Sequence, residues 1–240
     1  ICSGTLAGTE KHPQSAWTLN KVTVVLRSQA VDVLSPWALC IFLVFGGVAQ
    51  AAPQSITALP LQAEGEKLWR LPAGEYAGQF RIDQPMHLRC EPGAVIRAQG
   101  EGNALNIGAP DVTVEGCTLL DWGRDLTAMN SAVFIERNAR GAQLKDNRLE
   151  GAGFGIWADG TQDVKIIGNR IVGDPSVRSQ DRGNGIHLYA VHGAEVVGNH
   201  VRDTRDGIYI DTSNGNHLEG NVLEDLRYGV HYMFANDNSV

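Results

Sequence analysis

An asparagine that recurs in a fixed phase constrains the architecture of this 240-residue chain more than any other feature. It follows a glycine or an aspartate at each occurrence, and successive copies are separated by 22, 30 and 22 residues. The four copies are Asn147, Asn169, Asn199 and Asn221. Nine positions later comes an aliphatic residue preceded by glycine, once residues 174–181 are set aside as an insertion. Self-similarity at this period predicts a solenoid of about 22-residue coils, in which no coil buries its apolar face alone.

Apolar residues alternate inside each coil, which indicates strands with one buried face. The pairs that show it best are Val164 and Ile166, Ile186 and Leu188, and Ile208 and Ile210. No stretch has the helical periodicity that a leucine-rich or ankyrin repeat needs. We therefore predict an all-β, right-handed parallel β-helix, because crossovers between parallel strands are almost always right-handed. Residues 123–130 and 174–181 are expected to loop out of their coils.

The asparagines are expected to face inward at one corner, each amide bonded to the asparagine in the next coil. Cys117 takes the asparagine position in its own phrase, and Cys90 lies one coil earlier at nearly the same corner. The spacing of coils falls within the Cα separation that a disulfide allows, and an exported protein meets oxidants. A Cys90–Cys117 disulfide is one prediction, and two small buried hydrophobic side chains are the alternative.

The N-terminal part of the chain contains an export signature. Residues 36–48 are mainly apolar, Lys21 and Arg27 precede them, and Ala49-Gln50-Ala51 follows as a small-x-small cleavage motif. The apolar run is shorter than the roughly 20 residues that a membrane-spanning helix needs. We assign residues 1–35 to a leader or upstream sequence, expected to be disordered, and 36–51 to the apolar and cleavage regions of a signal peptide. Residues 56–240 form the β-helix domain, which we expect to be truncated at its C-terminus because no capping coil is visible.

Two columns of side chains are predicted to form an outward-facing patch on one strand per coil. Ten residues after each asparagine the column reads Trp157, His187, Tyr209 and His231; twelve residues after, it reads Asp159, Tyr189, Asp211 and Met233. One interpretation is that aromatic and histidine side chains simply stack to stabilise an exposed sheet. The other is a metal site, because imidazole and thioether are ligands that suit Cu(I).

The candidate copper ligands are His231 and Met233, which lie on the same strand face with backbones about 7 Å apart. His187, two coils away, is a third candidate if its side chain leans toward them. A site with so few ligands is expected to be labile and suited to metal transfer.

The formal net charge of −7 argues against nucleic acid or an anionic membrane as a partner. Many β-helices act on acidic sugars, so a carbohydrate-binding or polysaccharide-modifying protein (a lyase, hydrolase or epimerase) is the alternative class. Asp159, Asp206 and Asp211 are the acids that we expect to face outward. The Asp-Pro-His-Asp phrase of alginate epimerases is absent from the sequence, as is the paired Asp-Asp with Gly-His-Gly of polygalacturonases.

Three phrases together resemble the NosD family over about residues 56–240. They are Gly183-Asn-Gly-Ile-His-Leu188, Arg205-Asp-Gly-Ile-Tyr209 and, most specifically, Arg227-Tyr-Gly-Val-His-Tyr-Met233. Proteins of this family are periplasmic β-helices required for the maturation of nitrous oxide reductase in denitrification. The resemblance implies a periplasmic, non-enzymatic accessory protein that helps to assemble the reductase's copper-sulfide centre or supply its copper. The implied partners are an ABC transporter (the NosF ATPase and the NosY membrane subunit), the reductase, and a copper chaperone.

Overall fold

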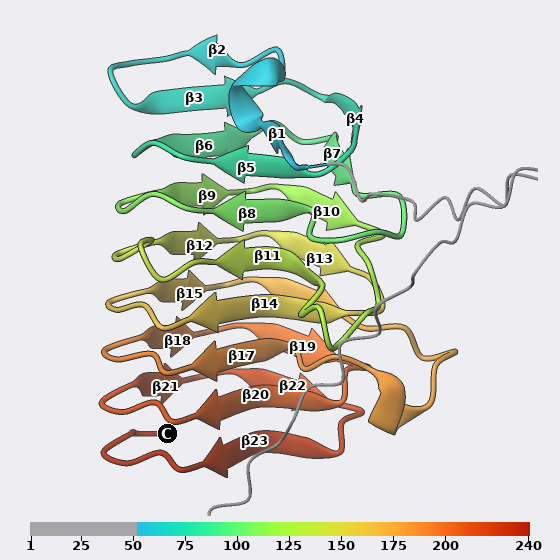
Figure 1. Cartoon of the computed structure of the whole chain (residues 1–240), viewed down its shortest axis with the longest axis vertical. Coiled ribbons are helices and arrows are strands. Elements are labelled where there is room, and N and C mark those ends of the chain that lie inside the picture. The colour runs from blue at the N-terminus through green and yellow to red at the C-terminus, as the bar shows by residue number, and fades with distance from the viewer. Residues whose placement is uncertain (1–51) are drawn as a thin grey trace, which may run out of the picture. The chain divides into compact units, whose positions relative to one another are not determined.

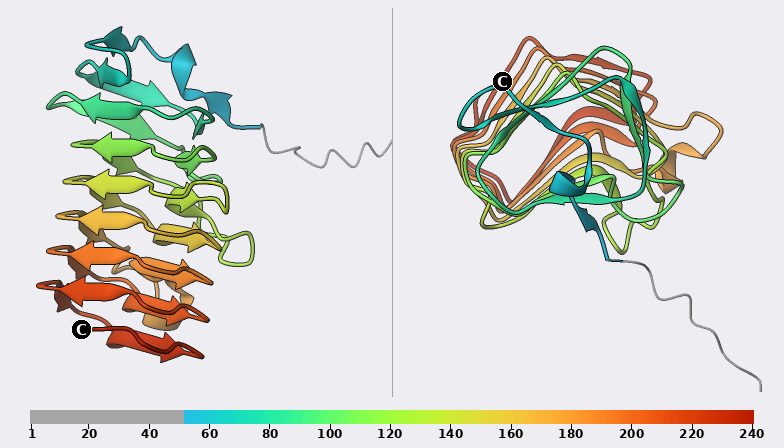
Figure 2. Two further views of the ribbon diagram at one scale, coloured as in Figure 1. Left: turned by 90° about the vertical axis from the view of Figure 1, so that its left-hand side faces the viewer. Right: turned by 90° about the horizontal axis from the view of Figure 1, so that it is seen from above.

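Each coil contributes one short strand to each of three sheets, and successive coils stack along a common axis (Figure 1). The computed structural model describes residues 52–240. Viewed along the axis, the coils superimpose on one another as a closed outline (Figure 2). The predicted all-β parallel β-helix is confirmed, since among the described strands only β2 and β3 pair in antiparallel fashion. The predicted leader and signal peptide lie outside the described residues.

The three sheets are named here by number. Sheet 1 contains β1 (Gln54–Ser55), β5 (Phe80–Ile82), β8 (Leu105–Ile107), β11 (Ser131–Ile135), β14 (Phe154–Asp159), β17 (Ile186–Tyr189), β20 (Asp206–Asp211) and β23 (Tyr228–Met233). Sheet 2 contains β4 (Gly74–Ala77), β7 (Ala94–Arg97), β10 (Thr118–Leu120), β13 (Arg148–Glu150), β16 (Arg170–Val172), β19 (His200–Arg202) and β22 (Val222–Glu224). Sheet 3 contains β2 (Gln62–Ala63), β3 (Leu68–Leu71), β6 (His87–Cys90), β9 (Thr113–Glu115), β12 (Gln143–Lys145), β15 (Lys165–Ile167), β18 (Glu195–Val197) and β21 (His217–Glu219).

Helical structure in the described residues is confined to two short 3₁₀ turns, η1 (Ile56–Ala58) and η2 (Ser179–Asp181). The turn η2 lies within residues 174–181, which leave the coil as a loop in the connection between β16 and β17. This loop is drawn in orange in Figure 1. Because the insertion loops out, Ile156 still pairs with Ile186 across a nominal 30-residue interval. Ile186 then pairs with Ile208 after the usual 22 residues. Within the described residues, no helix has the length and hydropathy needed to cross a bilayer.

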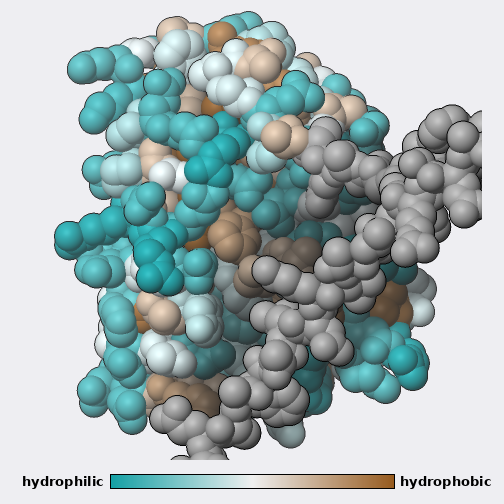
Figure 3. Space-filling view, in the orientation of Figure 1, coloured by the Kyte–Doolittle hydropathy of each residue, from teal (hydrophilic) through white to brown (hydrophobic). Residues whose placement is uncertain are grey.

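The alternating apolar residues fill the interior of the coils. Fully buried side chains from the three sheets form one continuous core, for example Ile156, Ile186 and Ile208 of sheet 1, Ile171 and Val201 of sheet 2, and Ile166 and Val196 of sheet 3. Each such side chain contributes about 1.5–3 kcal/mol relative to an exposed position. On the outside, the visible described face is mainly hydrophilic with small hydrophobic patches (Figure 3).

The asparagines form a continuous hydrogen-bonded ladder at the corner between sheets 3 and 2. The backbone N–H and the side-chain Nδ2 of Asn169 both donate to Oδ1 of Asn199, at 2.9 and 3.0 Å. The same pair of bonds joins Asn147 to Asn169 and Asn199 to Asn221. The residue before each asparagine has positive φ, as at Gly168 (+66°), which explains why only glycine or aspartate stands there.

Cys117 occupies the first position of this ladder, and its backbone N–H donates to Oδ1 of Asn147 at 2.9 Å. Its side chain forms a disulfide with Cys90, and the two Cα atoms are 4.9 Å apart. Of the two alternatives left open by the sequence, the structure therefore contains the bonded one.

Glycine at the entry to sheet 1 is required by the close approach of successive coils. A Cβ added to Gly155 would lie 2.4 Å from the carbonyl oxygen of Gly185, and one added to Gly207 would lie 2.6 Å from that of Gly229. No side chain fits such a gap. The repeated glycine-aliphatic phrase is therefore a packing requirement of the solenoid.

Candidate functional site

The first predicted column forms a stack of rings on the outer face of sheet 1. Trp157, His187, Tyr209 and His231 occupy paired positions on four successive strands. The ring centroids are 3.9 Å apart for Trp157 and His187, 4.6 Å for His187 and Tyr209, and 4.4 Å for Tyr209 and His231. The sheet register thus brings the column together as predicted.

The expectation that His187 faces solvent is wrong, because only 7% of this residue is exposed. Besides its neighbours in the stack, Phe154 packs edge-on against it with centroids 5.6 Å apart. The pocket beside it is also lined by Leu126, from the segment between β10 and β11, and by Arg182, which directly follows η2. The ring of Tyr209 lies between His187 and His231, so His187 does not join His231 as a ligand.

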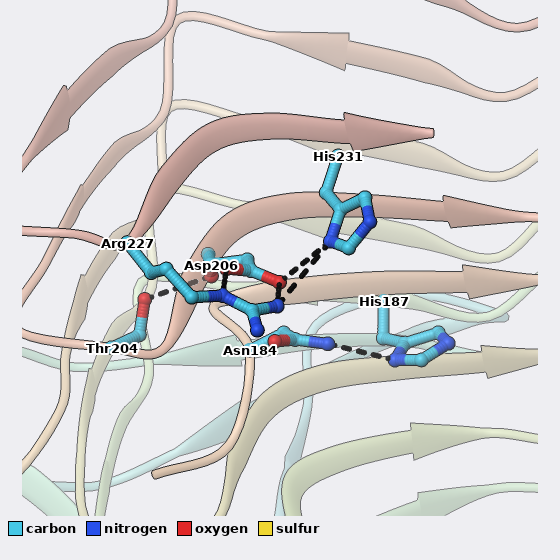
Figure 4. A network of polar contacts seen from close by, with 6 residues as sticks. All are labelled: Asn184, His187, Thr204, Asp206, Arg227 and His231. Atoms are coloured by element: carbon cyan, nitrogen blue, oxygen red, sulfur yellow. Dashed lines mark hydrogen bonds and ion pairs between the residues drawn. The ribbon is translucent and has the colours of Figure 1, made fainter. Parts of the chain in front are cut away.

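Burial lowers the pKa of His187 to about 3, against an opposing effect of Asp206. The ring is therefore neutral at pH 7. Its Nδ1 lies 3.1 Å from Nδ2 of Asn184 (Figure 4). Since the amide nitrogen can only donate, Nδ1 is the acceptor and the ring proton resides on Nε2.

Asp206, which we expected to face outward, is instead the fully buried centre of an ionic network (Figure 4). Arg227 donates from Nε to Oδ1 at 2.9 Å and from Nη2 to Oδ2 at 2.6 Å. His231 Nδ1 lies 2.9 Å from the same Oδ2. Burial raises the pKa of the Asp206 carboxyl, but the hydrogen bonds from Arg227 and His231 outweigh it, so that the pKa is below its usual value. The carboxylate is therefore ionised at neutral pH.

This network fixes the orientation and tautomer of His231. An ionised carboxylate only accepts, so Nδ1 of His231 donates to it. Arg227 Nη2 lies 3.4 Å from the same Nδ1, and we interpret this approach as two donors side by side on one oxygen rather than a bond between them. In the neutral ring Nε2 then carries the lone pair, and none of the described residues forms a hydrogen bond with it. A carboxylate on one ring nitrogen is the usual support for a histidine that binds metal through the other.

Met233 follows His231 on the same face of β23 and is 39% exposed. Both residues line one pocket of about 350 Å³ on the outer side of sheet 1. Together they offer an imidazole nitrogen and a thioether sulfur, a combination that favours a soft ion such as Cu(I). In residues 52–240 no cluster of three or more His, Cys, Asp or Glu side chains has the geometry to hold a metal. The fit is therefore to a weakly coordinated, exchangeable ion and not to a closed structural site.

The acids proposed for carbohydrate chemistry lie in different surroundings. Asp206 is buried and bonded to Arg227 and His231. Its lowered pKa makes it unsuited to act as a general acid. Asp159 and Asp211 lie two coils apart with Tyr189 between them in the register.

Two features escaped the sequence reasoning. Asp206 and its partner Arg227 were not recognised as a pair, although Arg205 and Arg227 recur at the 22-residue period. A second amide ladder also exists, in which the backbone and side chain of Asn216 donate to Oδ1 of Asn238 at 2.9 Å. The only signal for it was one further 22-residue spacing.

Comparisons with known proteins bear on the same region. A family model described as "Periplasmic copper-binding protein (NosD)" matches residues 167–240, which include the His231 network. A protein of Stutzerimonas stutzeri named "Probable ABC transporter binding protein NosD" is 70% identical over 182 residues, covering 76% of this chain and 42% of that protein. A protein of the same name from Pseudomonas aeruginosa is 54% identical over 160 residues, covering 67% of this chain and 37% of its own length.

A third protein of this name, also from Pseudomonas aeruginosa, is 58% identical over 100 residues, which are 42% of this chain and 92% of that protein. The chain therefore spans less than half the length of the first two relatives and nearly all of the third. Among solved structures, a pectin methylesterase from Yersinia enterocolitica matches with a TM-score of 0.41 and 18% identity, covering 78% of this chain and 66% of that one.

Proposed function

Since this chain belongs to the NosD family, we propose that it is part of a periplasmic, non-enzymatic accessory protein for the maturation of nitrous oxide reductase. In this proposal the protein holds Cu(I) transiently and passes it on for assembly of the reductase's copper-sulfide centre. The description of the matching family model as periplasmic and copper-binding supports both the location and the metal.

One observation carries the proposal: the Asp206 carboxylate holds His231 through Nδ1 at 2.9 Å and leaves Nε2 available. The lowered pKa of Asp206 means that this support persists at neutral pH. Arg227 neutralises the buried carboxylate, so the His231 ring need not be protonated to balance its charge. The imidazole is thus oriented before any metal arrives, which reduces the entropic cost of binding.

The thioether of Met233 supplies the second donor and sets the preference for Cu(I). Its partial exposure favours release, because an incoming ligand from a partner can approach the metal without unfolding the coil. A cargo site should bind weakly enough to transfer its ion, and two ligands at a pocket mouth meet that requirement. Copper is cargo in this proposal and not a resident cofactor.

The proposed partners are an ABC transporter formed by NosF and NosY, nitrous oxide reductase, and a copper chaperone that loads the site. The name of the relatives, "ABC transporter binding protein", supports the first of these.

An anaerobic Cu(I) titration against a colorimetric chelator tests the site. The parent protein should withdraw copper from the chelator, whereas the double variant His231→Ala, Met233→Leu should lose that copper. The matched control is His217→Ala, a half-exposed histidine on sheet 3. Equal copper binding by parent and double variant, or none by the parent, would refute the assignment.

A further inference from the structure

The charged side chains that line the pocket of the proposed copper site are all arginines. They are Arg182, Arg205 and Arg227, and no carboxylate of the described residues lines the pocket with them. The charge of Arg227 is balanced by the buried Asp206 carboxylate. Arg182 donates to three backbone carbonyl oxygens, which leave its positive charge uncancelled. Arg205 forms no ion pair with any described residue. The pocket therefore has an excess of positive charge on a chain whose formal net charge is −7.

Arg205 lies one coil from the network that orients His231. The backbone N–H of Arg227 donates to the carbonyl oxygen of Arg205 at 2.8 Å, so the two arginines occupy equivalent positions on adjacent coils. Nη2 of Arg227 in turn lies 3.4 Å from Nδ1 of His231. Because Arg205 lines the same pocket, its charge acts on an ion that is bound there.

The Tyr209 phenol, whose ring packs against the imidazole ligand with centroids 4.4 Å apart, responds to the same charges. Burial raises the pKa of this phenol, and the Asp211 and Asp206 carboxylates raise it further. The Arg205 and Arg227 guanidinium groups act in the opposite direction. The positive charge of Arg205 therefore reaches the ring that contacts the imidazole ligand.

A positive pocket discriminates between cations by their charge. The two proposed ligands, a neutral imidazole and a thioether, bring no negative charge to offset the arginines. The repulsion between a guanidinium group and a bound ion is proportional to the charge of the ion, so it is twice as large for a divalent ion as for Cu(I). This electrostatic preference adds to the preference that the soft thioether sets.

We propose that Arg205 is a specificity-determining residue, which makes the His231–Met233 site select monovalent Cu(I) over divalent ions such as Cu(II) and Zn(II). This inference rests on the proposed function, because it concerns the ion that those two ligands hold. Arg205 acts on the choice of ion, whereas Arg227 and Asp206 act on the orientation of the ligand.

Anaerobic competition titrations with Cu(I) and with Zn(II), each against a chromophoric chelator at low ionic strength, test the proposal. Arg205→Met keeps the aliphatic stem and removes the charge. The affinity for Cu(I) should rise about threefold and that for Zn(II) about tenfold, because the change in binding free energy doubles with the charge of the ion. A variant that binds Zn(II) no better than the parent overturns the proposal.

Two control variants separate charge from structure. Arg205→Lys keeps the positive charge and should retain the selectivity of the parent. Arg148→Met removes an exposed arginine that is paired with Glu150 on sheet 2, and it should change neither affinity. A gain in Zn(II) affinity in Arg205→Lys or in Arg148→Met equal to that in Arg205→Met would show that the local charge is not the cause, and would overturn the proposal.

A measurement on the parent protein covers the case in which a variant does not fold. Added sodium nitrate screens charges, so the affinity for Zn(II) relative to that for Cu(I) should rise between about 20 and 200 mM salt. Control by the overall negative charge of the chain gives the opposite sign, and a falling ratio would overturn the proposal. If the parent binds no Cu(I), the proposed function fails and this inference fails with it. If Cu(I) binds and the charge dependence is absent, only this inference fails.

Discussion

Mild acid should destabilise this protein through His187, and the size of the effect follows from its burial. The pKa of His187 is lowered from 6.5 to about 3, chiefly because burial disfavours the charged ring. Between these values the unfolded chain binds a proton that the folded protein excludes, so stability is complete above about pH 6.5 and falls as the pH decreases toward 3. If the imidazole has its ordinary pKa in the unfolded chain, this difference in proton binding lowers the free energy of unfolding by about 2 kcal/mol between pH 7.5 and pH 5.

The assay is urea unfolding of the parent and the His187→Phe variant at pH 7.5, 6 and 5. The variant is expected to be less stable at pH 7.5 because Asn184 loses its partner, so the comparison concerns the change with pH and not the absolute values. The parent should lose about 2 kcal/mol more than the variant over this range. Asp206 does not interfere, since a lowered carboxyl pKa costs stability only as the pH falls below about 5. Parallel pH profiles for the two proteins would refute the account of a buried, neutral His187.

Three further changes test the supports of the fold and the site. Asn199→Ala should lower the free energy of unfolding by about 3 kcal/mol, because the fully buried amide joins two coils of the ladder, and unchanged urea unfolding would contradict this role. Arg227→Met leaves the buried Asp206 carboxylate without its cation and should lower the free energy of unfolding by about 3 kcal/mol. This value is the lower end of the usual range for a broken buried ion pair, because Arg227 is partly exposed. A thermal midpoint equal to the parent's would argue against the ion pair. The Cys90–Cys117 disulfide joins residues with a sequence separation of 27, and its reduction should lower the free energy of unfolding in urea by about 3 kcal/mol. Equal stability with and without reductant would show that the bond does not constrain the chain.

The fold was accessible from the sequence because its determinants are local and repeat in phase. Each ladder asparagine follows a residue with positive φ, so two adjacent residues such as Gly168 and Asn169 are enough to identify a corner in the sequence. The close approach at Gly155 likewise restricts one position to a single residue type. Once coils are in phase, the register of sheet 1 follows, and the ring column from Trp157 to His231 follows from that register.

The surroundings of the ring column from Trp157 to His231 could not be predicted from the sequence in the same way. Strand alternation tells which face of a sheet a side chain occupies, but not what covers that face. His187 is 7% exposed, with Phe154 edge-on against it, and its pocket is also lined by Leu126 and Arg182 from irregular segments between strands. The conformation of such segments leaves no periodic signal in the sequence. The pairing of Asp206 with Arg227 depends on a side chain 21 residues away that reaches back across one coil. The sequence therefore suggested the two candidate ligands of the proposed site, which remain a prediction, but it did not indicate Asp206, the residue that orients His231.

In the proposed function, the imidazole of His231 and the thioether of Met233 bind Cu(I) in this pocket. X-ray absorption at the copper edge of the protein loaded with one equivalent of Cu(I) measures those ligands directly. The spectrum should contain a sulfur scatterer that disappears in Met233→Leu and an imidazole that disappears in His231→Ala, with both retained in His217→Ala. A first shell of nitrogen and oxygen alone, or a spectrum that neither substitution changes, would contradict it.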